Sequence, residues 1–329
     1  MNWGILSTGR IAGVFAQAVL ESKTGRLAAV GSRNLRSAKR FASEFKIPNV
    51  HDSYAKLLKD TSVEAVYIAT PHPSHAEWAI KAAKAGKHIL CEKPLTMNVR
   101  ETKSVLAAAR RHKVFLMEAF AYRPHPQTAK LLELIRRGAI GEVRLIQSSF
   151  CYNAAYDPSN RIFNRKLGGG GILDIGCYPV SIARLIAGVA RRKPFLDPVE
   201  VRGIGRIGRT GVVEWAMALL KFPGDILAEV TCGVRTEGET VLRVHGSKGS
   251  ITIPMPFSAG RKAGKTQIFI RKGERVQTLT VKSDQSLYVW EADATVNSIR
   301  RGKRESSFMN WADSLGNSKT LDLWLRAIR

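Results

Sequence analysis

The sequence predicts a two-domain α/β protein, in which an N-terminal doubly wound parallel sheet precedes an α+β domain with a large open, mainly antiparallel sheet. The chain has 329 residues, whereas a single hydrophobic core rarely grows beyond roughly 250 residues. The first 120 residues alternate short apolar strands with amphipathic helical segments, a pattern typical of a parallel sheet. After Arg123-Pro124, long alternating polar and apolar runs take over. We therefore divide the chain into residues 1–122 and 123–329.

The elements of the first domain follow from hydrophobic spacing. Strands are expected at short apolar runs bounded by turn residues, at 2–6, 26–32, 49–50, 65–69, 87–91 and 114–118. Helices are expected where apolar residues recur at helical spacing, at 11–21, 35–45, 54–59, 75–85 and 99–112. Gly86 is a typical C-terminal stop for the fourth helix. This alternation predicts a nucleotide-binding domain.

The second domain is expected to be a sheet with a few helices. A helix at 127–137 precedes strands at 142–152, 199–207, 214–222, 226–234, 240–245, 250–253 and 267–271, and helices at 289–301 and 310–328 close the chain. Turn residues such as Pro223-Gly224-Asp225 separate the strands. Because an uncovered sheet face must be buried, we expect a homodimer or a higher homo-oligomer.

The composition limits the partners and the compartment. The formal net charge is +25, but the basic residues form short dispersed groups without a nucleic-acid reading motif. We expect a basic surface that attracts an anionic cofactor, and no specific nucleic acid. The four cysteines are far apart and form no C-x-x-C pair, which favours reduced thiols. With no export signal and no window of about 18 apolar residues, we expect a cytoplasmic protein that binds no membrane.

A cofactor loop follows the first strand. The segment Ser7-Thr8-Gly9-Arg10-Ile11-Ala12 matches the dinucleotide fingerprint G-x-G-x-x-G/A, with serine at the first position. Gly9 lets the backbone approach a pyrophosphate, and the small Ala12 lets helix and strand pack closely. The alternative is an ordinary tight turn. The position of the motif before the first helix favours a Rossmann cofactor site at Ser7, Thr8, Gly9, Arg10 and Ile11.

The end of the second strand indicates which dinucleotide is bound. An acid at this position selects NAD, whereas an arginine accommodates the 2′-phosphate of NADP. The segment reads Ser32-Arg33-Asn34-Leu35-Arg36-Ser37 and contains no acid. Ser32, Arg33 and Arg36 can bind a phosphate through charge-assisted hydrogen bonds. We predict that the cofactor is NADP, with NAD as the alternative cofactor. The alternative for Arg33 is that it is an ordinary surface arginine at the start of a helix.

Two further segments lie at the carboxyl ends of strands, where open α/β sheets bind ligands. They are Thr70-Pro71-His72-Pro73-Ser74-His75 and Glu92-Lys93-Pro94. We expect Thr70, Pro71, His72, His75 and Glu92 to line the cofactor pocket, with Lys93 over the same crevice. A metal pair of His72 and His75 is the alternative, but no further ligand is evident, so no metal is predicted.

A glycine run marks the catalytic part of the second domain. Gly168-Gly169-Gly170-Gly171 leads into Ile172-Leu173-Asp174-Ile175-Gly176-Cys177-Tyr178-Pro179. If this turn is helical, Asp174 and Tyr178 are four positions apart and share a face. Each of these residues also has a structural alternative. Asp174 could cap a helix, Tyr178 could be an aromatic residue of the core, and Lys93 could be a surface lysine.

At these residues the sequence resembles the glucose-fructose oxidoreductase and inositol dehydrogenase family, whose Glu-Lys-Pro motif appears as Glu92-Lys93-Pro94. Within it, Gly4-Ile5-Leu6-Ser7, Met117-Glu118-Ala119-Phe120 and the tyrosine at 178 look most like the dihydrodiol dehydrogenases. The segment 118–126 is similar to NADP-dependent xylose dehydrogenases. The resemblance covers essentially the whole chain and implies an NADP-dependent oxidoreductase acting on a sugar, polyol or diol.

The resemblance also implies site residues. It places Tyr122, Arg123, Asn160 and Arg161 in the pocket, with Arg161 also at the cofactor, although solvated-loop roles are an alternative. Many members carry histidine where this chain has Tyr178, which makes tyrosine the more natural acid or base here.

The catalytic hypothesis joins Lys93, Asp174 and Tyr178. A free phenol, with a pKa near 10, is a poor base at neutral pH, and a neighbouring ammonium favours the phenolate. We expect Tyr178 to exchange a proton with the substrate oxygen while a hydride moves to or from the nicotinamide. Lys93 is expected to give electrostatic help, and Asp174 to position the pair of Lys93 and Tyr178. In an alternative, Lys93 carries the proton and Tyr178 orients the substrate. In another, the protein is a catalytically silent NAD(P)-sensing regulator.

Overall fold

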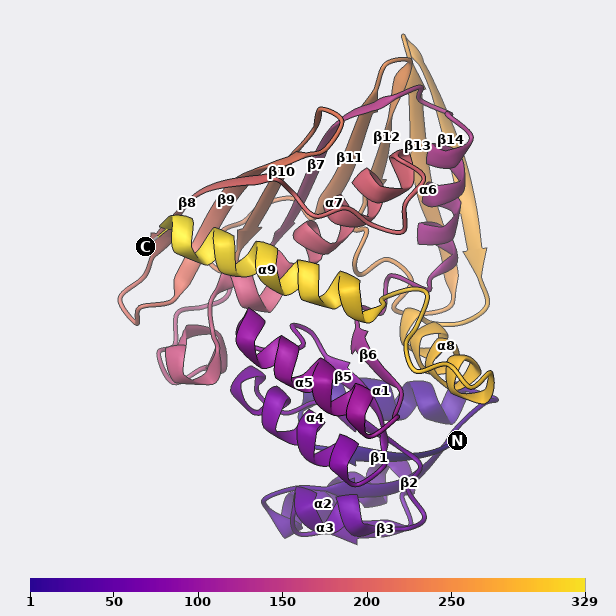
Figure 1. Cartoon of the computed structure of the whole chain (residues 1–329), viewed down its shortest axis with the longest axis vertical. Helices are drawn as coiled ribbons and strands as arrows, with labels where there is room; N and C mark the ends of the chain where they lie inside the picture. The colour runs from indigo at the N-terminus through magenta and orange to yellow at the C-terminus, as the bar shows by residue number, and fades with distance from the viewer. Residues whose placement is uncertain (329) are drawn as a thin grey trace. The chain divides into compact units, whose positions relative to one another are not determined.

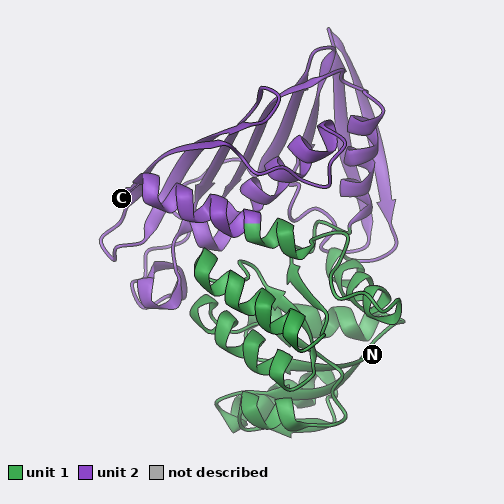
Figure 2. Ribbon diagram, in the orientation of Figure 1, with its two compact units in different colours: residues 1–124, 286–315 green, residues 125–285, 316–329 purple. Residues whose placement is uncertain are grey.

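The computed structural model describes residues 1–328 and divides into two compact units, shown in Figure 2. Unit 1 comprises residues 1–124 and 286–315. Unit 2 comprises residues 125–285 and the chain from Gly316 onward. The division proposed from sequence kept residues 286–315 in the second domain, whereas they fold into unit 1.

Unit 1 is built on a six-stranded sheet in which all neighbouring strands are parallel. Its order is β3-β2-β1-β4-β5-β6. The strands are β1 (Asn2–Leu6), β2 (Arg26–Gly31), β3 (Asn49–His51), β4 (Ala65–Ile68), β5 (His88–Glu92) and β6 (Leu116–Ala119). The order reverses between β1 and β4, which places the ligand crevice of such folds at the carboxyl ends of these strands.

Several helices of unit 1 begin where the sequence supplies a side-chain cap. The helices of this unit are α1 (Arg10–Glu21), α2 (Leu35–Phe45), α3 (Tyr54–Lys59), α4 (His75–Lys84), α5 (Val99–Arg111) and α8 (Leu287–Arg300). The side chains of Asn34, Ser53 and Asn98 accept backbone N–H groups at the starts of α2, α3 and α5, which satisfies donors that a helix leaves unpaired. The apolar faces of the helices pack against the sheet. For example, Phe15 of α1 stacks on Tyr67 of β4, with 3.8 Å between the ring centroids.

Unit 2 is built on an eight-stranded sheet of order β14-β13-β12-β11-β7-β10-β9-β8. The strands are β7 (Val143–Cys151), β8 (Glu200–Ile207), β9 (Val213–Phe222), β10 (Ile226–Gly233), β11 (Val241–Gly246), β12 (Gly249–Pro254), β13 (Gly264–Lys272) and β14 (Arg275–Ser283). Every neighbouring pair is antiparallel except β7 and β10, which are parallel. The predicted mainly antiparallel sheet is therefore confirmed.

Helices cover one face of this sheet. Within unit 2, α6 (Pro126–Arg136) packs against β13 and β14, and α7 (Cys177–Ala190) packs against β7 and β10. The C-terminal helix α9 (Trp311–Ile328) reaches the sheet through Trp324, whose indole N–H donates to the carbonyl oxygen of Met217 at 3.2 Å. Figure 1 shows these helices on the same side of the strands. On the other face Leu219 remains 63% exposed.

The segment Arg165–Ala190 corrects one sequence expectation. By length and composition it is apolar enough to cross a membrane, although none was expected, and 94% of its apolar window is buried inside the protein. It includes α7, which is buried on nearly all sides. Its composition therefore suits a core helix.

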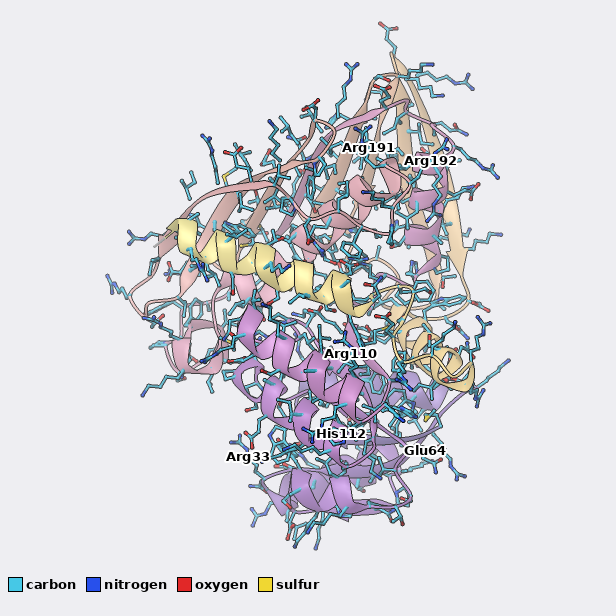
Figure 3. All side chains as sticks on the ribbon, viewed as in Figure 1. Arg33, Glu64, Arg110, His112, Arg191 and Arg192 are labelled. Carbon is cyan, nitrogen blue, oxygen red and sulfur yellow. The ribbon has the colours of Figure 1, made fainter. Side chains whose placement is uncertain are left out.

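The basic side chains are spread over both units. In the view of Figure 3, nitrogen-tipped side chains extend around the outlines of unit 1 and unit 2. The labelled Arg33 lies in the loop after β2, Arg110 lies in α5 and Arg191 follows α7. The basic residues that give the net charge of +25 are thus spread over both units rather than gathered in one patch.

Candidate active site

The turn after β1 has the backbone shape of a dinucleotide loop. Ser7 adopts φ 106°, a conformation that glycine tolerates and other residues rarely adopt. Its N–H donates to the carbonyl oxygen of Gly31 at 3.0 Å, and its Oγ accepts the N–H of Gly9 at 3.3 Å. At Gly9, the N-cap of α1, no side chain caps the helix, and the first turn contains no acid. These orphan N–H donors fit a pyrophosphate.

The loop after β2 presents cations without an acid. Arg33 and Arg36 are exposed, whereas Ser32 is buried and its Oγ accepts the N–H of Asn34 at 3.2 Å. Asn34 in turn caps α2 by accepting the N–H of Ser37 at 3.0 Å. The caps fix the loop backbone, and the two guanidinium groups remain at the surface near a helix start. This donor set fits an anionic phosphate ester.

The predicted residues after β4 and β5 belong to one hydrogen-bonded group in unit 1. His75 is fully buried, with Nε2 2.8 Å from the carbonyl oxygen of Thr70 and Nδ1 2.9 Å from that of Pro94. The ring of His72 meets the ring of His75 edge-on at 5.6 Å. His75 therefore joins the segment after β4 to the Glu92-Lys93-Pro94 segment.

Glu92 is buried at the end of β5. Its carboxylate accepts the hydroxyl of Tyr67 through Oε1 and the backbone N–H of Lys93 at 3.2 Å through Oε2. Burial and the nearby Glu92 charge raise the pKa of Tyr67 well above its usual value. The Lys93 side chain is half-buried. Glu92 thus supports the backbone from which Lys93 extends.

Tyr122 and Arg123 lie in the interior of unit 1, only 1% and 4% exposed. The Arg123 guanidinium donates to the Tyr122 hydroxyl at 2.9 Å, to the carbonyl oxygen of Phe308 at 3.2 Å and to Asp313 at 3.0 Å. Burial lowers the pKa of Arg123, but the charge of Asp313 and the hydrogen bonds to Asp313 and Tyr122 together raise it above its usual value. This ion pair accounts for the buried charge, and a substrate contact by either residue stays a prediction.

In unit 2 the predicted Asp174 is held through both carboxylate oxygens. The Arg161 guanidinium donates to Oδ1 at 2.7 Å, and the Tyr152 hydroxyl donates to Oδ2 at 2.6 Å. Asp174 is 7% exposed. The half-buried Tyr178 packs its ring against Phe150 at 5.4 Å and Phe257 at 5.3 Å. Asn160 is exposed, and its side chain accepts the N–H of Ile162 at 3.0 Å.

Local sequence explains this arrangement. A Cβ at Gly169 would stand 2.4 Å from the carbonyl oxygen of Ile162 and 2.5 Å from that of Arg161. Only glycine allows the run to pass so close to the turn that carries Arg161. The run continues into a π-helix, Ile172–Gly176, which replaces the expected regular turn before α7. Single π turns are frequent at functional sites.

Sequence reasoning missed several contacts of these residues. Tyr152, Phe150 and Phe257 touch Asp174 or Tyr178 from strand ends and a loop. Glu118 in β6 was read only as part of a family motif, although its Oε1 accepts the N–H of Leu95 at 2.9 Å. One signal was available for Glu118, because it is a single acid inside an otherwise apolar strand.

The predicted catalytic residues are divided between the units. Lys93 belongs to unit 1, and Asp174 and Tyr178 belong to unit 2. The structure brings Asp174, Arg161 and Tyr152 together within unit 2. The approach of Lys93 to Tyr178 stays a prediction. Among residues 1–328, no group of three or more His, Cys, Asp or Glu side chains is placed to hold a metal.

Comparison with known proteins covers both units. A family described as "Oxidoreductase family, NAD-binding Rossmann fold" matches residues 1–120, and the "GFO/IDH/MocA C-terminal domain" matches residues 128–252. The trans-1,2-dihydrobenzene-1,2-diol dehydrogenase of Mus musculus is 33% identical over 323 residues, covering 95% of this chain and 92% of that protein. The Homo sapiens protein of the same name is 34% identical over 259 residues, covering 78% and 75%.

Among solved structures, the 3-ketoreductase KijD10 of Actinomadura kijaniata in complex with NADP and TDP-benzene is similar over the whole chain. The TM-score is 0.90 at 27% identity, and the match covers 100% of this chain and 98% of that one. A lysine-to-alanine variant and a tyrosine-to-phenylalanine variant of that ketoreductase, both in complex with TDP-benzene and NADP, also match.

Proposed function

Because the chain belongs to the GFO/IDH/MocA oxidoreductase family, we propose that it transfers a hydride between NADP and a CH–OH or carbonyl carbon of a sugar or cyclic trans-diol. The chain is an oxidoreductase with an NAD(P)-binding domain, which favours an active enzyme over the catalytically silent regulator. The proposal depends most on the similarity to diol dehydrogenases over 95% of the chain.

The preference for NADP rests on the loop after β2. Arg33 and Arg36 are exposed beside the start of α2, and residues 32–37 contain no acid that would repel a 2′-phosphate. The similar ketoreductase was crystallised with NADP. Ser7, Thr8, Gly9, Arg10 and Ile11 would hold the pyrophosphate at the start of α1. In the cofactor pocket, the remaining proposed residues are Ser32, Thr70, Pro71, His72, His75, Glu92, Lys93 and Arg161.

The bound nicotinamide supplies the hydride acceptor or donor. In the oxidation direction, the phenolate of Tyr178 takes the proton of the substrate hydroxyl as the C–H bond breaks, and in reduction the phenol returns it. The Lys93 ammonium stabilises the negative charge on the phenolate and on the substrate oxygen. Asp174, fixed by Arg161 and Tyr152, positions the substrate. In the alternative, Lys93 carries the proton and Tyr178 orients the substrate.

A Tyr178→Phe variant separates these two versions. Loss of the phenol should lower kcat by about 100-fold or more if Tyr178 carries the proton. Full turnover by the variant would leave Lys93 as the proton carrier. Binding of NADPH, followed by its fluorescence, reports whether the variant still holds its cofactor.

The first experiment is a substrate search with the whole protein. NADPH titration should show saturable binding, and NADP with diols, pentoses and hexoses should produce absorbance at the reduced nicotinamide band. Binding without turnover on any alcohol, or on the matching carbonyl compounds with NADPH, would contradict the proposed reaction. The substrate search also distinguishes cyclic diols from open sugars.

We further propose a homodimer formed through the open sheet face of unit 2. Every second residue along the middle of β9 is exposed on this face. These residues are Trp215, Met217 and Leu219, which are 42%, 45% and 63% exposed. Apolar area of this kind favours association. Sedimentation of the parent and of a Leu219→Asp variant should give a dimer and a monomer, respectively. A cytoplasmic location is also proposed, which the four free cysteines suit.

A further inference from the structure

The peptide group that follows Pro94 is held at both of its polar atoms by buried side chains. Its carbonyl oxygen, that of Pro94, lies 2.9 Å from Nδ1 of His75. Its N–H, that of Leu95, donates to Oε1 of Glu118 at 2.9 Å. His75 opens α4 and Glu118 lies in β6. All four residues belong to unit 1, and one peptide plane is thus fixed from two separate elements.

His75 binds two segments at once. Its second ring nitrogen, Nε2, lies 2.8 Å from the carbonyl oxygen of Thr70. Carbonyl oxygens only accept hydrogen bonds, so both contacts are hydrogen bonds only when both ring nitrogens carry protons. The imidazole is 0% exposed.

Glu118 is a buried carboxyl group in which one oxygen accepts a backbone hydrogen bond and, within the described part of the chain, the other oxygen accepts none. It is 2% exposed, Oε1 binds Leu95, and Oε2 has no hydrogen-bond partner among residues 1–328. The Ser314 hydroxyl also donates to this carboxyl group. Burial raises the pKa of Glu118 to about 7, Asp313 acts in the same direction, and Arg123 opposes it.

The anchored peptide lies one residue beyond Lys93. The Lys93 N–H is itself bound by Oε2 of Glu92 at 3.2 Å, and the Pro94 ring restricts the backbone between them. Residues 93–95 are therefore fixed by Glu92, His75 and Glu118. A change at the Pro94–Leu95 peptide would reach the Lys93 Cα through a stiff connection.

We propose that His75 and Glu118 are positioning residues that hold the Pro94–Leu95 peptide and thereby set the place of the Lys93 ammonium. The catalytic consequence rests on the proposed function, in which Lys93 assists proton transfer. A displacement of about 1 Å in a catalytic group can lower a rate by about 100-fold. Loss of the anchor should therefore lower kcat more than it weakens cofactor binding.

The central test compares Glu118→Leu with Glu291→Leu. Glu291 in α8 is also a fully buried acid of unit 1 whose pKa burial raises well above its usual value, and both of its oxygens lack partners among residues 1–328. It makes no bond to residues 93–95 in the described contacts. The two substitutions thus remove similar buried groups, and only Glu118→Leu removes the anchor.

Two readouts need no substrate. Amide hydrogen exchange at Leu95 should accelerate at least tenfold, as an order of magnitude for local opening, in Glu118→Leu and stay unchanged in Glu291→Leu. The ¹³C signal of reductively methylated Lys93 should shift in Glu118→Leu alone. Unchanged Leu95 exchange or an unchanged Lys93 signal would overturn the proposal, even if no substrate has been found.

With a substrate, kcat of Glu118→Leu should fall about tenfold or more, while the Kd for NADPH stays within about threefold. An unchanged kcat together with faster Leu95 exchange would overturn the positioning role and leave the proposed reaction intact. Conversely, failure of the substrate search would remove the proposed function without affecting the two spectroscopic readouts.

Glu118→Gln provides the second variant, because glutamine keeps the oxygen that accepts from Leu95. The Leu95 amide shift of the parent should titrate with a midpoint at about 7, and that of Glu118→Gln should not. The charged or titratable groups facing Glu118 are Arg123, Asp313 and Cys91, and His75 faces the same peptide. A parent Leu95 amide that does not respond between pH 5 and 9 would contradict the contact.

Discussion

The Arg161 guanidinium lies 2.7 Å from Oδ1 of Asp174, while the Tyr152 hydroxyl binds the other carboxylate oxygen at 2.6 Å. The carboxylate is therefore oriented by unit 2 itself. Such orientation before substrate arrives saves the reorganisation that a free side chain would require. Asp174 can then act as a fixed acceptor beside the π turn that leads to Tyr178.

Replacing Asp174 with asparagine should lower kcat by about 10- to 100-fold. The Glu214–Arg235 ion pair is a matched control, because its side chains are 5% and 38% exposed against 10% and 37% for Asp174 and Arg161. Asp174→Asn and Glu214→Gln should each lower the free energy of unfolding by about 1–3 kcal/mol. Steady-state kinetics and urea unfolding measure both effects. Equal losses of kcat in the two variants would assign Asp174 a structural role only.

Replacing Arg33 with alanine should raise the Kd for NADPH about tenfold or more and leave the Kd for NADH unchanged. The reason is the loss of a charge-assisted bond to the 2′-phosphate, which NADH lacks. Arg40→Ala serves as the control, because Arg40 is an exposed arginine of α2 outside the loop. Fluorescence titration with each cofactor gives the constants. A parallel weakening of both cofactors would contradict a phosphate contact.

Ser7→Gly should be more stable than Ser7→Ala by about 1 kcal/mol or more, because only alanine retains the cost of φ 106°. Both variants lose the Ser7 hydroxyl, so their difference isolates the backbone. At Ser104, exposed within α5, the order should reverse, with glycine about 1 kcal/mol less stable than alanine. Thermal unfolding of the four variants provides the comparison. An alanine variant equal to the glycine variant at position 7 would contradict backbone strain there.

Glu118 should make stability depend on pH. The unfolded chain releases this proton near pH 4.5, whereas the folded protein keeps it up to about 7. The free energy of unfolding should therefore fall between these values by about 3 kcal/mol and then level off. Glu118→Gln should remove that fall and exceed the parent in stability at pH 8 but not at pH 4. Urea unfolding across this range decides it, and parallel curves for the two proteins would contradict a raised Glu118 pKa.

Much of the fold could be predicted because its signals are local. The strands and helices of unit 1 follow apolar spacing, and the Ser7–Ile11 loop lies at the expected strand-to-helix turn. In unit 2, β14 was missed because it is an edge strand with mostly exposed residues, so its apolar alternation is weak. The long α7 was missed because burial on nearly every side removes the amphipathic period.

The sequence by itself determined the family, the two sheets and the residue types available at the strand ends, because these depend on neighbouring residues and their spacing. Only the tertiary structure decided that 286–315 folds into unit 1, that Tyr152 and Arg161 share Asp174, and that His75 and Glu118 hold one peptide. Those contacts join elements far apart in the chain. Their geometry depends on how whole strands and helices pack, which no local pattern specifies.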